Sequence, residues 1–124
     1  MAHVRAPVVS VRLTGVIAQG MPITPSDEYV TISAEKIDAG EIVLRVGRDV
    51  TEFGLRARDL LIVEPRLHQQ AATGEFVIAL QGERAFIGRW WAKHGQRMLL
   101  DDAFQTIARA LRVYGAITLI VRDE

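Results

Sequence analysis

Residues 54–63 read Gly-Leu-Arg-Ala-Arg-Asp-Leu-Leu-Ile-Val, and the second half of this stretch decides the fold class. Its last four residues are all aliphatic, so the run 59–63 does not alternate between apolar and polar side chains. A short uninterrupted apolar run of this kind predicts a strand with both faces buried. Pro65 is expected to end the strand, because proline lacks the N–H that a sheet ladder needs.

Similar short runs, rich in β-branched and aliphatic residues and separated by turn residues, occur along the rest of the chain. They predict a mainly β fold. Residues 81–83, Gln-Gly-Glu, lie between two of these runs and predict a hairpin. Gly115 is expected to mark a bulge or a close approach of two backbones. The further strands expected from these runs cover residues 8–17, 29–32, 41–46, 75–80, 84–91, 97–100 and 113–121.

Three segments are expected to depart from regular strands. Residues 18–27 contain Gly20, Pro22 and Pro25, which oppose regular pairing and predict an extended arm or loop. Residues 33–37 are expected to form a single turn with Ser33 as its cap. Residues 101–111 have helical periodicity behind an aspartate that could cap a helix, so periodicity alone predicts a short helix there. Its apolar positions are Phe104, Ile107, Ala108 and Leu111.

Composition limits the function classes. The chain has 124 residues, enough for one domain, and its 15 basic residues balance its 15 acidic ones. This neutrality weighs against a strongly basic nucleic-acid binder. The absence of cysteine excludes a disulfide scaffold, a thiolate metal site and a cysteine nucleophile. No signal peptide or membrane-spanning stretch is recognisable, so a cytoplasmic protein without a membrane partner is expected.

No metal or other cofactor is expected, because the three histidines have no metal-ligand spacing. They are His3, His68 and His94. Five arginines form the densest basic set, but acidic residues alternate with them, so we expect self-paired surface charge and no direct DNA binding. These arginines are Arg45, Arg48, Arg56, Arg58 and Arg66. Trp90 and Trp91 should point to opposite faces of a strand, one into the core and the other to an interface or to ordinary surface.

From Gly40 onward, the order of these pieces resembles the C-terminal domain of the LexA/UmuD family, the Ser–Lys self-cleaving peptidases. Residues 54–63 resemble the family's G-I-x-x-G-D-L-L-x-V, and residues 74–79 resemble its G-x-x-V-V-A strand. Residues 104–107 resemble its Y/F-x-P-I segment, and residues 113–122 resemble its closing V-x-G-x-V-x-x-V-x-R strand. Upstream, residues 15–22 are similar to the cleavage arm.

The resemblance covers residues 11–123 and implies a single domain, 1–124, of curved antiparallel sheets with the LexA C-terminal, signal-peptidase-like fold. The arm would span residues 11–27 and the core residues 28–123, without the helix-turn-helix domain of the repressors. It also implies that the segment around Phe104 is irregular or extended, against the helix that periodicity favours.

The family's chemistry needs a serine that attacks the peptide carbonyl and a neutral, buried lysine that acts as the general base. The serine should lie five residues before the glycine that matches Gly54, which is the position of Asp49. The lysine should lie near position 88, which is Gly88. No serine follows Ser33, and Arg89 cannot act as a base because its pKa stays above about 12.

The cleavage site is altered too, because Gln19 separates Ala18 from Gly20, where the family cuts a small-residue–glycine bond. We therefore expect a non-catalytic relative, a pseudo-peptidase, rather than an enzyme. Asp49 itself is expected to face solvent or to pair with Arg48.

The resemblance further implies a homodimer formed through the final strand, with a protein partner in a bacterial stress or DNA-damage response. Two alternatives stay open at this stage. One is an active self-cleaving peptidase with rewired residues, namely Asp49, Thr51 or Lys93. The other is a regulatory lobe that pairs with an intact repressor; a damage-tolerant polymerase is the partner that the UmuD type implies. The expected dimer positions are Val113, Ile117, Leu119 and Val121.

Overall fold

A computed structural model describes residues 7–66, 71–109 and 111–122. The predicted mainly β class is confirmed, and two single-turn 3₁₀ helices, η1 (Ala34–Lys36) and η2 (Thr51–Phe53), are the helical elements of this part of the chain. No helix within these ranges is long and apolar enough to cross a membrane. The strands are β1 (Val8–Arg12), β2 (Gly15–Ile17), β3 (Met21–Pro22), β4 (Thr24–Pro25), β5 (Tyr29–Ser33), β6 (Ile42–Val46), β7 (Leu60–Pro65), β8 (Phe76–Gln81), β9 (Arg84–Lys93), β10 (Gln96–Leu100), β11 (Thr106–Arg109) and β12 (Arg112–Val121).

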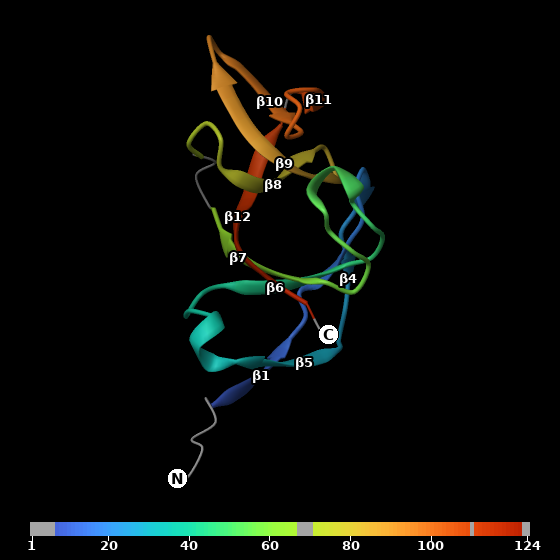
Figure 1. The fold of residues 1–124 in the computed structure, drawn as a ribbon, viewed down its shortest axis with the longest axis vertical. Helices are drawn as coiled ribbons and strands as arrows, with labels where there is room; N and C mark the ends of the chain where they lie inside the picture. The colour runs from blue at the N-terminus through green and yellow to red at the C-terminus, as the bar shows by residue number, and fades with distance from the viewer. Residues whose placement is uncertain (1–6, 67–70, 110, 123–124) are drawn as a thin grey trace.

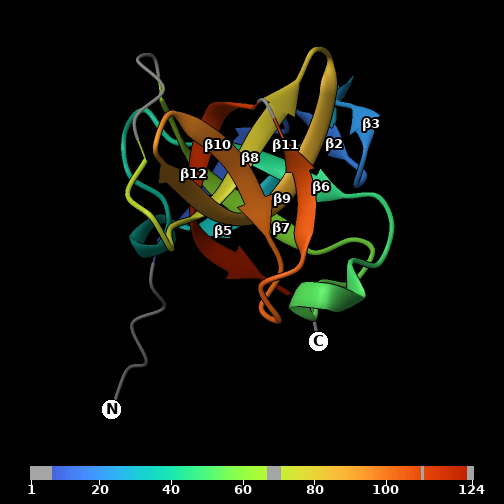
Figure 2. The same cartoon turned by 90° about the horizontal axis from the view of Figure 1, so that it is seen from above.

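Ten strands form one strongly curved sheet in the order β11-β10-β9-β8-β12-β7-β6-β2-β4, with β3 attached to β9 (Figures 1 and 2). Its pairs are antiparallel except for β2 with β6. Strands β1 and β5 form a separate two-stranded ribbon. Figure 1 shows this ribbon at one end of the molecule and the β9–β10 hairpin at the other.

Strand β7 is buried on both faces, as its sequence predicts, because Leu60 to Val63 are at most 7% exposed. Leu61 and Val63 pack into one core cluster with Leu44. Leu60 and Ile62 pack into a second cluster beneath the β1–β5 ribbon. Burying each such side chain contributes about 1.5–3 kcal/mol before the cost in conformational entropy is counted.

The expected strand 8–17 is interrupted, which the sequence did not predict. The Leu13 N–H donates to Glu28 O at 2.8 Å, and the Thr14 N–H donates to Val43 O at 2.9 Å. These two residues therefore carry the chain from the ribbon to the main sheet. In the arm, β3 and β4 pair for only two residues each, and each contains a proline, Pro22 or Pro25, that cannot donate a ladder hydrogen bond.

The prediction of a helix at 101–111 from periodicity is wrong. The irregular or extended form that the resemblance implies is observed. Asp101 Oδ1 accepts the N–H groups of Ala103 and Gln105, both at 2.9 Å, which closes a turn instead of capping a helix. Phe104 has a φ of 61° and is 77% exposed, and β11 then pairs with β10. The single turn expected at 33–37 is observed as η1 with Ser33 at its N-cap position, but the Ser33 side chain forms no capping hydrogen bond.

The prediction for Gly115 is confirmed in both respects. The register of β12 against β8 shifts between Val113 and Gly115. A Cβ at Gly115 would lie 2.6 Å from Val63 Cγ1 and 2.7 Å from Glu64 O, so the backbones of β12 and β7 approach too closely for a side chain.

The last strand is tied to the start of β7 by an ion pair. The carboxylate of Asp59, 2% exposed, accepts hydrogen bonds from Arg122 Nε at 2.9 Å and from Nη2 at 2.7 Å. Its Oδ2 also accepts the Arg56 N–H at 2.9 Å, and Arg122 Nη2 donates to Gly54 O at 2.9 Å. The hydrogen bond from Arg122 lowers the pKa of Asp59 against the opposing effect of burial.

Replacing Arg122 should make the protein more sensitive to acid. Because the native pKa of Asp59 lies below its unfolded value of about 3.9, the ionised carboxylate stabilises the fold at neutral pH, and this contribution is lost as the pH falls through the native pKa. In Arg122→Gln, the burial of Asp59 still raises its pKa, so acid unfolding should begin at a higher pH. Circular dichroism against pH measures this. Arg48→Gln, an exposed arginine without an ion pair in the described ranges, should leave the midpoint unchanged; equal shifts in both variants would contradict the assignment.

Candidate functional site

Asp49, at the position expected for the nucleophile, lies exposed at the start of a small closed loop. Its Oδ1 accepts the Ala57 N–H at 2.8 Å. Val50 and Leu55 pair through two backbone hydrogen bonds of 2.9 and 3.1 Å, with η2 and the left-handed Gly54 between them. The carboxylate thus closes the loop, and it forms no ion pair with Arg48 in the described structure.

The loop packs against β9 through apolar side chains. Val50 and Leu55, each 2% exposed, share a core cluster with Ile87 of β9. The ring of Phe53 lies 5.1 Å from that of Phe76, and the guanidinium of Arg89 lies 4.7 Å above the Phe76 ring. The apolar side chains of the loop therefore belong to the main core, and Phe53 contacts β8.

Gly88, at the position expected for the lysine, faces away from this loop. A Cβ on Gly88 would lie 3.1 Å from Ile107 Cδ1 and 3.2 Å from Leu99 Cβ, on the side of β9 that faces β10 and β11. Since neighbouring residues of a strand point to opposite faces, Ile87 is the residue that faces the loop. Ile87, and not Gly88, therefore belongs to the core cluster that contains Val50.

The residues invoked for a rewired peptidase lie on separate elements. Thr51 is exposed on η2, and Lys93 is exposed at the end of β9, beside the β9–β10 turn. At about 3.3 Å per residue, a strand carries Lys93 roughly 16 Å beyond Gly88. Lys93 is solvent-exposed and therefore lies outside the apolar core.

The residues of the altered cleavage site form a tight turn. The Met21 N–H donates to Ala18 O at 3.0 Å, and Gly20 within the turn has a φ of 78°, in the left-handed region that favours glycine. The Gly20 N–H donates to Ala85 O at 2.8 Å, and Met21 pairs with Ala85 in the β3–β9 ladder. The arm is therefore docked on the edge of β9.

Gln19 fastens this turn to β9 at Ile87. Its Oε1 accepts the Ile87 N–H at 2.7 Å, and its Nε2 donates to Ile87 O at 2.8 Å. The side-chain amide thus reproduces the two hydrogen bonds that a neighbouring strand would form. From the sequence, Gln19 was expected only to interrupt the cleavage site. The one sequence signal for its hydrogen bonds to Ile87 is that it is a single amide side chain beside an apolar stretch.

The side chains of the expected dimer strand differ in their exposure to solvent. Val113 is fully buried, and Ile117 and Val121 are half-buried. A register shift between Ile117 and Leu119 brings two successive residues to the surface, Leu119 at 39% and Ile120 at 40% exposure. In the described structure, residues 117–121 pair only with β7, because the ladder to β8 ends at Ala116. One backbone edge of this segment is open.

The other residues singled out from the sequence lie apart from this site. Trp90 is 2% exposed in the core, as expected of one of the two tryptophans, and Trp91 is half-buried opposite Met98. Arg45 pairs with Glu28 at 2.8 Å, and Arg66 pairs with Glu75 at 2.6 Å. Exposed His94 lies in the β9–β10 turn, His3 and His68 fall outside the described residues, and no cluster of three metal-binding side chains occurs within them.

Two comparisons with known proteins identify no relative of this chain. No protein-family model matches the chain, and a search of curated proteins finds no match.

Removing the Gln19 side chain should loosen the arm. Gln19→Ala deletes two partly buried hydrogen bonds, each with a net contribution of about 0.5–1.5 kcal/mol, and leaves the Ile87 N–H without its acceptor. Amide hydrogen exchange should accelerate at Ile87 and Gly20. Gln81→Ala is the matched control, because it removes one exposed hydrogen bond, to Arg109 O. Unchanged protection at Ile87 would contradict the proposed contact.

Proposed function

We propose that this chain is a non-catalytic relative of the LexA/UmuD peptidase domains and works as a protein-interaction and dimerisation module. The observation that carries the proposal is that Val50, Leu55 and Ile87 lie together in one buried aliphatic core cluster. Self-cleavage would require a hydroxyl and a deprotonated amine at such a place. An aliphatic contact supplies neither a nucleophile nor a base, whereas it stabilises the loop as a fixed surface.

The family assignment is supported by residues from separate motifs that meet in space. Gly54 and Asp59, of the first motif, both accept hydrogen bonds from Arg122, the last residue of the closing motif. Gly115 of the closing motif abuts Val63 of the first. Arg58 occupies the position where the family pattern has its second glycine, and its φ of 79° retains the backbone conformation that glycine favours.

The docked arm supports a role in binding rather than cleavage. A peptidase must present its scissile bond to the nucleophile, with the reacting atoms about 3–3.5 Å apart. Here Ala18 to Met21 form a closed turn, and Gln19 fixes that turn to β9. The groove edge that would receive a substrate strand is thereby held by the chain's own arm.

The open edge of β12 supports dimerisation. Its free backbone groups can pair with the same segment of a second chain, and Leu119 and Ile120 add exposed apolar surface beside it. In the setting that the resemblance implies, a bacterial stress or DNA-damage response in the cytoplasm, the partner is a damage-tolerant polymerase or an intact repressor.

The chain should not cleave itself. Incubation at mildly alkaline pH followed by intact-mass spectrometry should recover the full mass, because no exposed hydroxyl is activated beside the arm. Gln19→Ala should behave in the same way, since releasing the arm does not create a nucleophile. A cut between Ala18 and Gly20 that disappears in Lys93→Ala would instead establish the rewired peptidase.

The chain should form a dimer through β12. Light scattering coupled to size exclusion should give the dimer mass, and Leu119→Arg with Ile120→Arg should weaken association by about tenfold or more, because two charges would be buried at the contact. Met21→Arg is the matched control, since Met21 is 49% exposed on β3, which pairs with β9 and not with β12. A monomeric wild type, or a dimer that the double variant leaves intact, would refute the β12 contact.

A further inference from the structure

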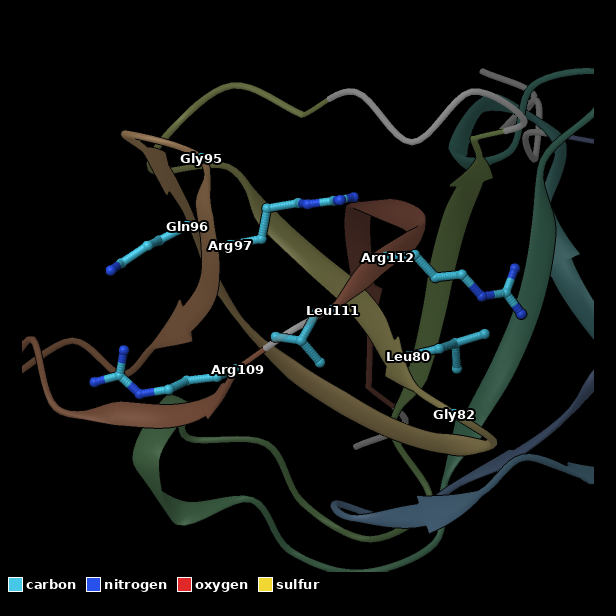
Figure 3. A pocket seen from close by; sticks show the side chains of 8 residues that line it. All are labelled: Leu80, Gly82, Gly95, Gln96, Arg97, Arg109, Leu111 and Arg112. Atoms are coloured by element: carbon cyan, nitrogen blue, oxygen red, sulfur yellow. The ribbon is translucent and has the colours of Figure 1, made fainter.

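A hollow of about 620 Å³ opens where β8, β10, β11 and β12 come together (Figure 3). Leu80 and Leu111 are its apolar lining residues. Three arginines on three different strands surround them: Arg97 on β10, Arg109 on β11 and Arg112 on β12. The remaining lining residues are Gly82, Gly95 and Gln96.

The charge of this hollow is uncompensated. None of its lining residues is acidic, and the three arginines are exposed. None of them forms an ion pair with a carboxylate in the described ranges of the chain. The whole chain has no net charge, so this concentration of positive charge is local. A concave surface lined by one sign of charge attracts a ligand of the opposite sign.

The placement of the arginines favours an elongated anion over a compact one. In Figure 3, Arg109 and Arg112 extend toward opposite sides of the hollow, and Arg97 extends from β10 across it. Guanidinium groups that diverge in this way favour carboxylates spaced along an extended chain over a single compact phosphate.

An apolar hollow continues from the first. It measures about 390 Å³, and Pro22 and Ile23 of the arm line it together with Tyr114. Both hollows share Leu80, Gly82 and Arg112, so they form one groove with a cationic end and an apolar end. Glu83 is the acidic residue among the lining residues of this second part.

We propose that this groove binds an acidic peptide segment of a partner protein, with carboxylates on Arg97, Arg109 and Arg112 and an apolar side chain between Ile23 and Tyr114. A nucleic-acid strand fits less well, because no aromatic side chain lines the cationic end, where bases would need to stack. The groove is separate from the open edge of β12, so the proposal holds whether or not the chain dimerises.

The test measures fluorescence anisotropy of a labelled synthetic peptide that alternates glutamate with leucine. The wild type should bind it, and binding should weaken with added salt. Arg97→Gln, Arg109→Gln and Arg112→Gln together should weaken it about tenfold, as expected for three partly exposed charge pairs. Glu83→Gln should strengthen it. The control combines Arg12→Gln, Lys36→Gln and Arg48→Gln, which removes the same charge from exposed positions outside the groove.

Several results would overturn the proposal. One is no binding of the peptide to the wild type, and another is equal weakening by the triple variant and the control. A third is equally strong binding of the peptide in which glutamine replaces glutamate, because the carboxylates would then be irrelevant. Displacement of the peptide by single-stranded DNA at lower concentration than by unlabelled peptide would assign the groove to nucleic acid instead.

Discussion

The ion pair between Asp59 and Arg122 is the interaction on which the rest of the fold depends. A carboxylate that is 2% exposed would destabilise the protein if it had no partner, because a buried charge has lost its hydration and needs a compensating group. Here both of its oxygens are satisfied by Arg122 and by the Arg56 N–H. The pair fixes the turn before β7 to the end of β12, so the two central strands of the sheet are joined by charge as well as by their ladder.

The same turn controls the candidate site. The Gly54 carbonyl in this turn accepts a hydrogen bond from Arg122. This bond holds the C-terminal end of the preceding loop in place. Val50 and Leu55 can then pack on Ile87, whose backbone holds Gln19 of the arm. Loop, strand and arm therefore form one interlocked unit, in which packing and backbone pairing replace the polar contacts that a catalytic pair would need.

Sequence patterns predicted the features that depend on local sterics. The burial of β7 follows from its uninterrupted apolar run, the β8–β9 hairpin from its glycine turn, and the close approach at Gly115 from the missing side chain. Features that depend on distant partners were not predictable. The break after Arg12 arises from hydrogen bonds to Glu28 and Val43, and the role of Gln19 depends on Ile87, 68 residues away.

The helical periodicity of residues 101–111 failed for a related reason. The spacing of apolar residues indicates which side chains can be buried together. It does not indicate which groups form hydrogen bonds with the backbone. Here the Asp101 side chain accepts the Gln105 N–H, which a helix would have bonded to the Asp101 carbonyl, and β10 offers a ladder to the residues that follow. Extended structure therefore buries Ala108 while leaving Phe104 in solvent.

The balanced composition conceals a separation of charge that bears on the choice of partner. The arginine-lined hollow lies at the ends of β8, β10, β11 and β12, whereas another hollow, of about 510 Å³ beside η1, has four acidic lining residues, Glu35, Asp38, Glu41 and Glu64, and one basic one, Lys36. A contact between these two hollows on different copies would use two different surfaces, and such head-to-tail contacts generate open chains unless the rotation closes a ring. Pairing through β12 uses one surface twice and closes at two copies. The second mode limits assembly to a dimer and leaves the arginine-lined groove available to an acidic segment of another protein.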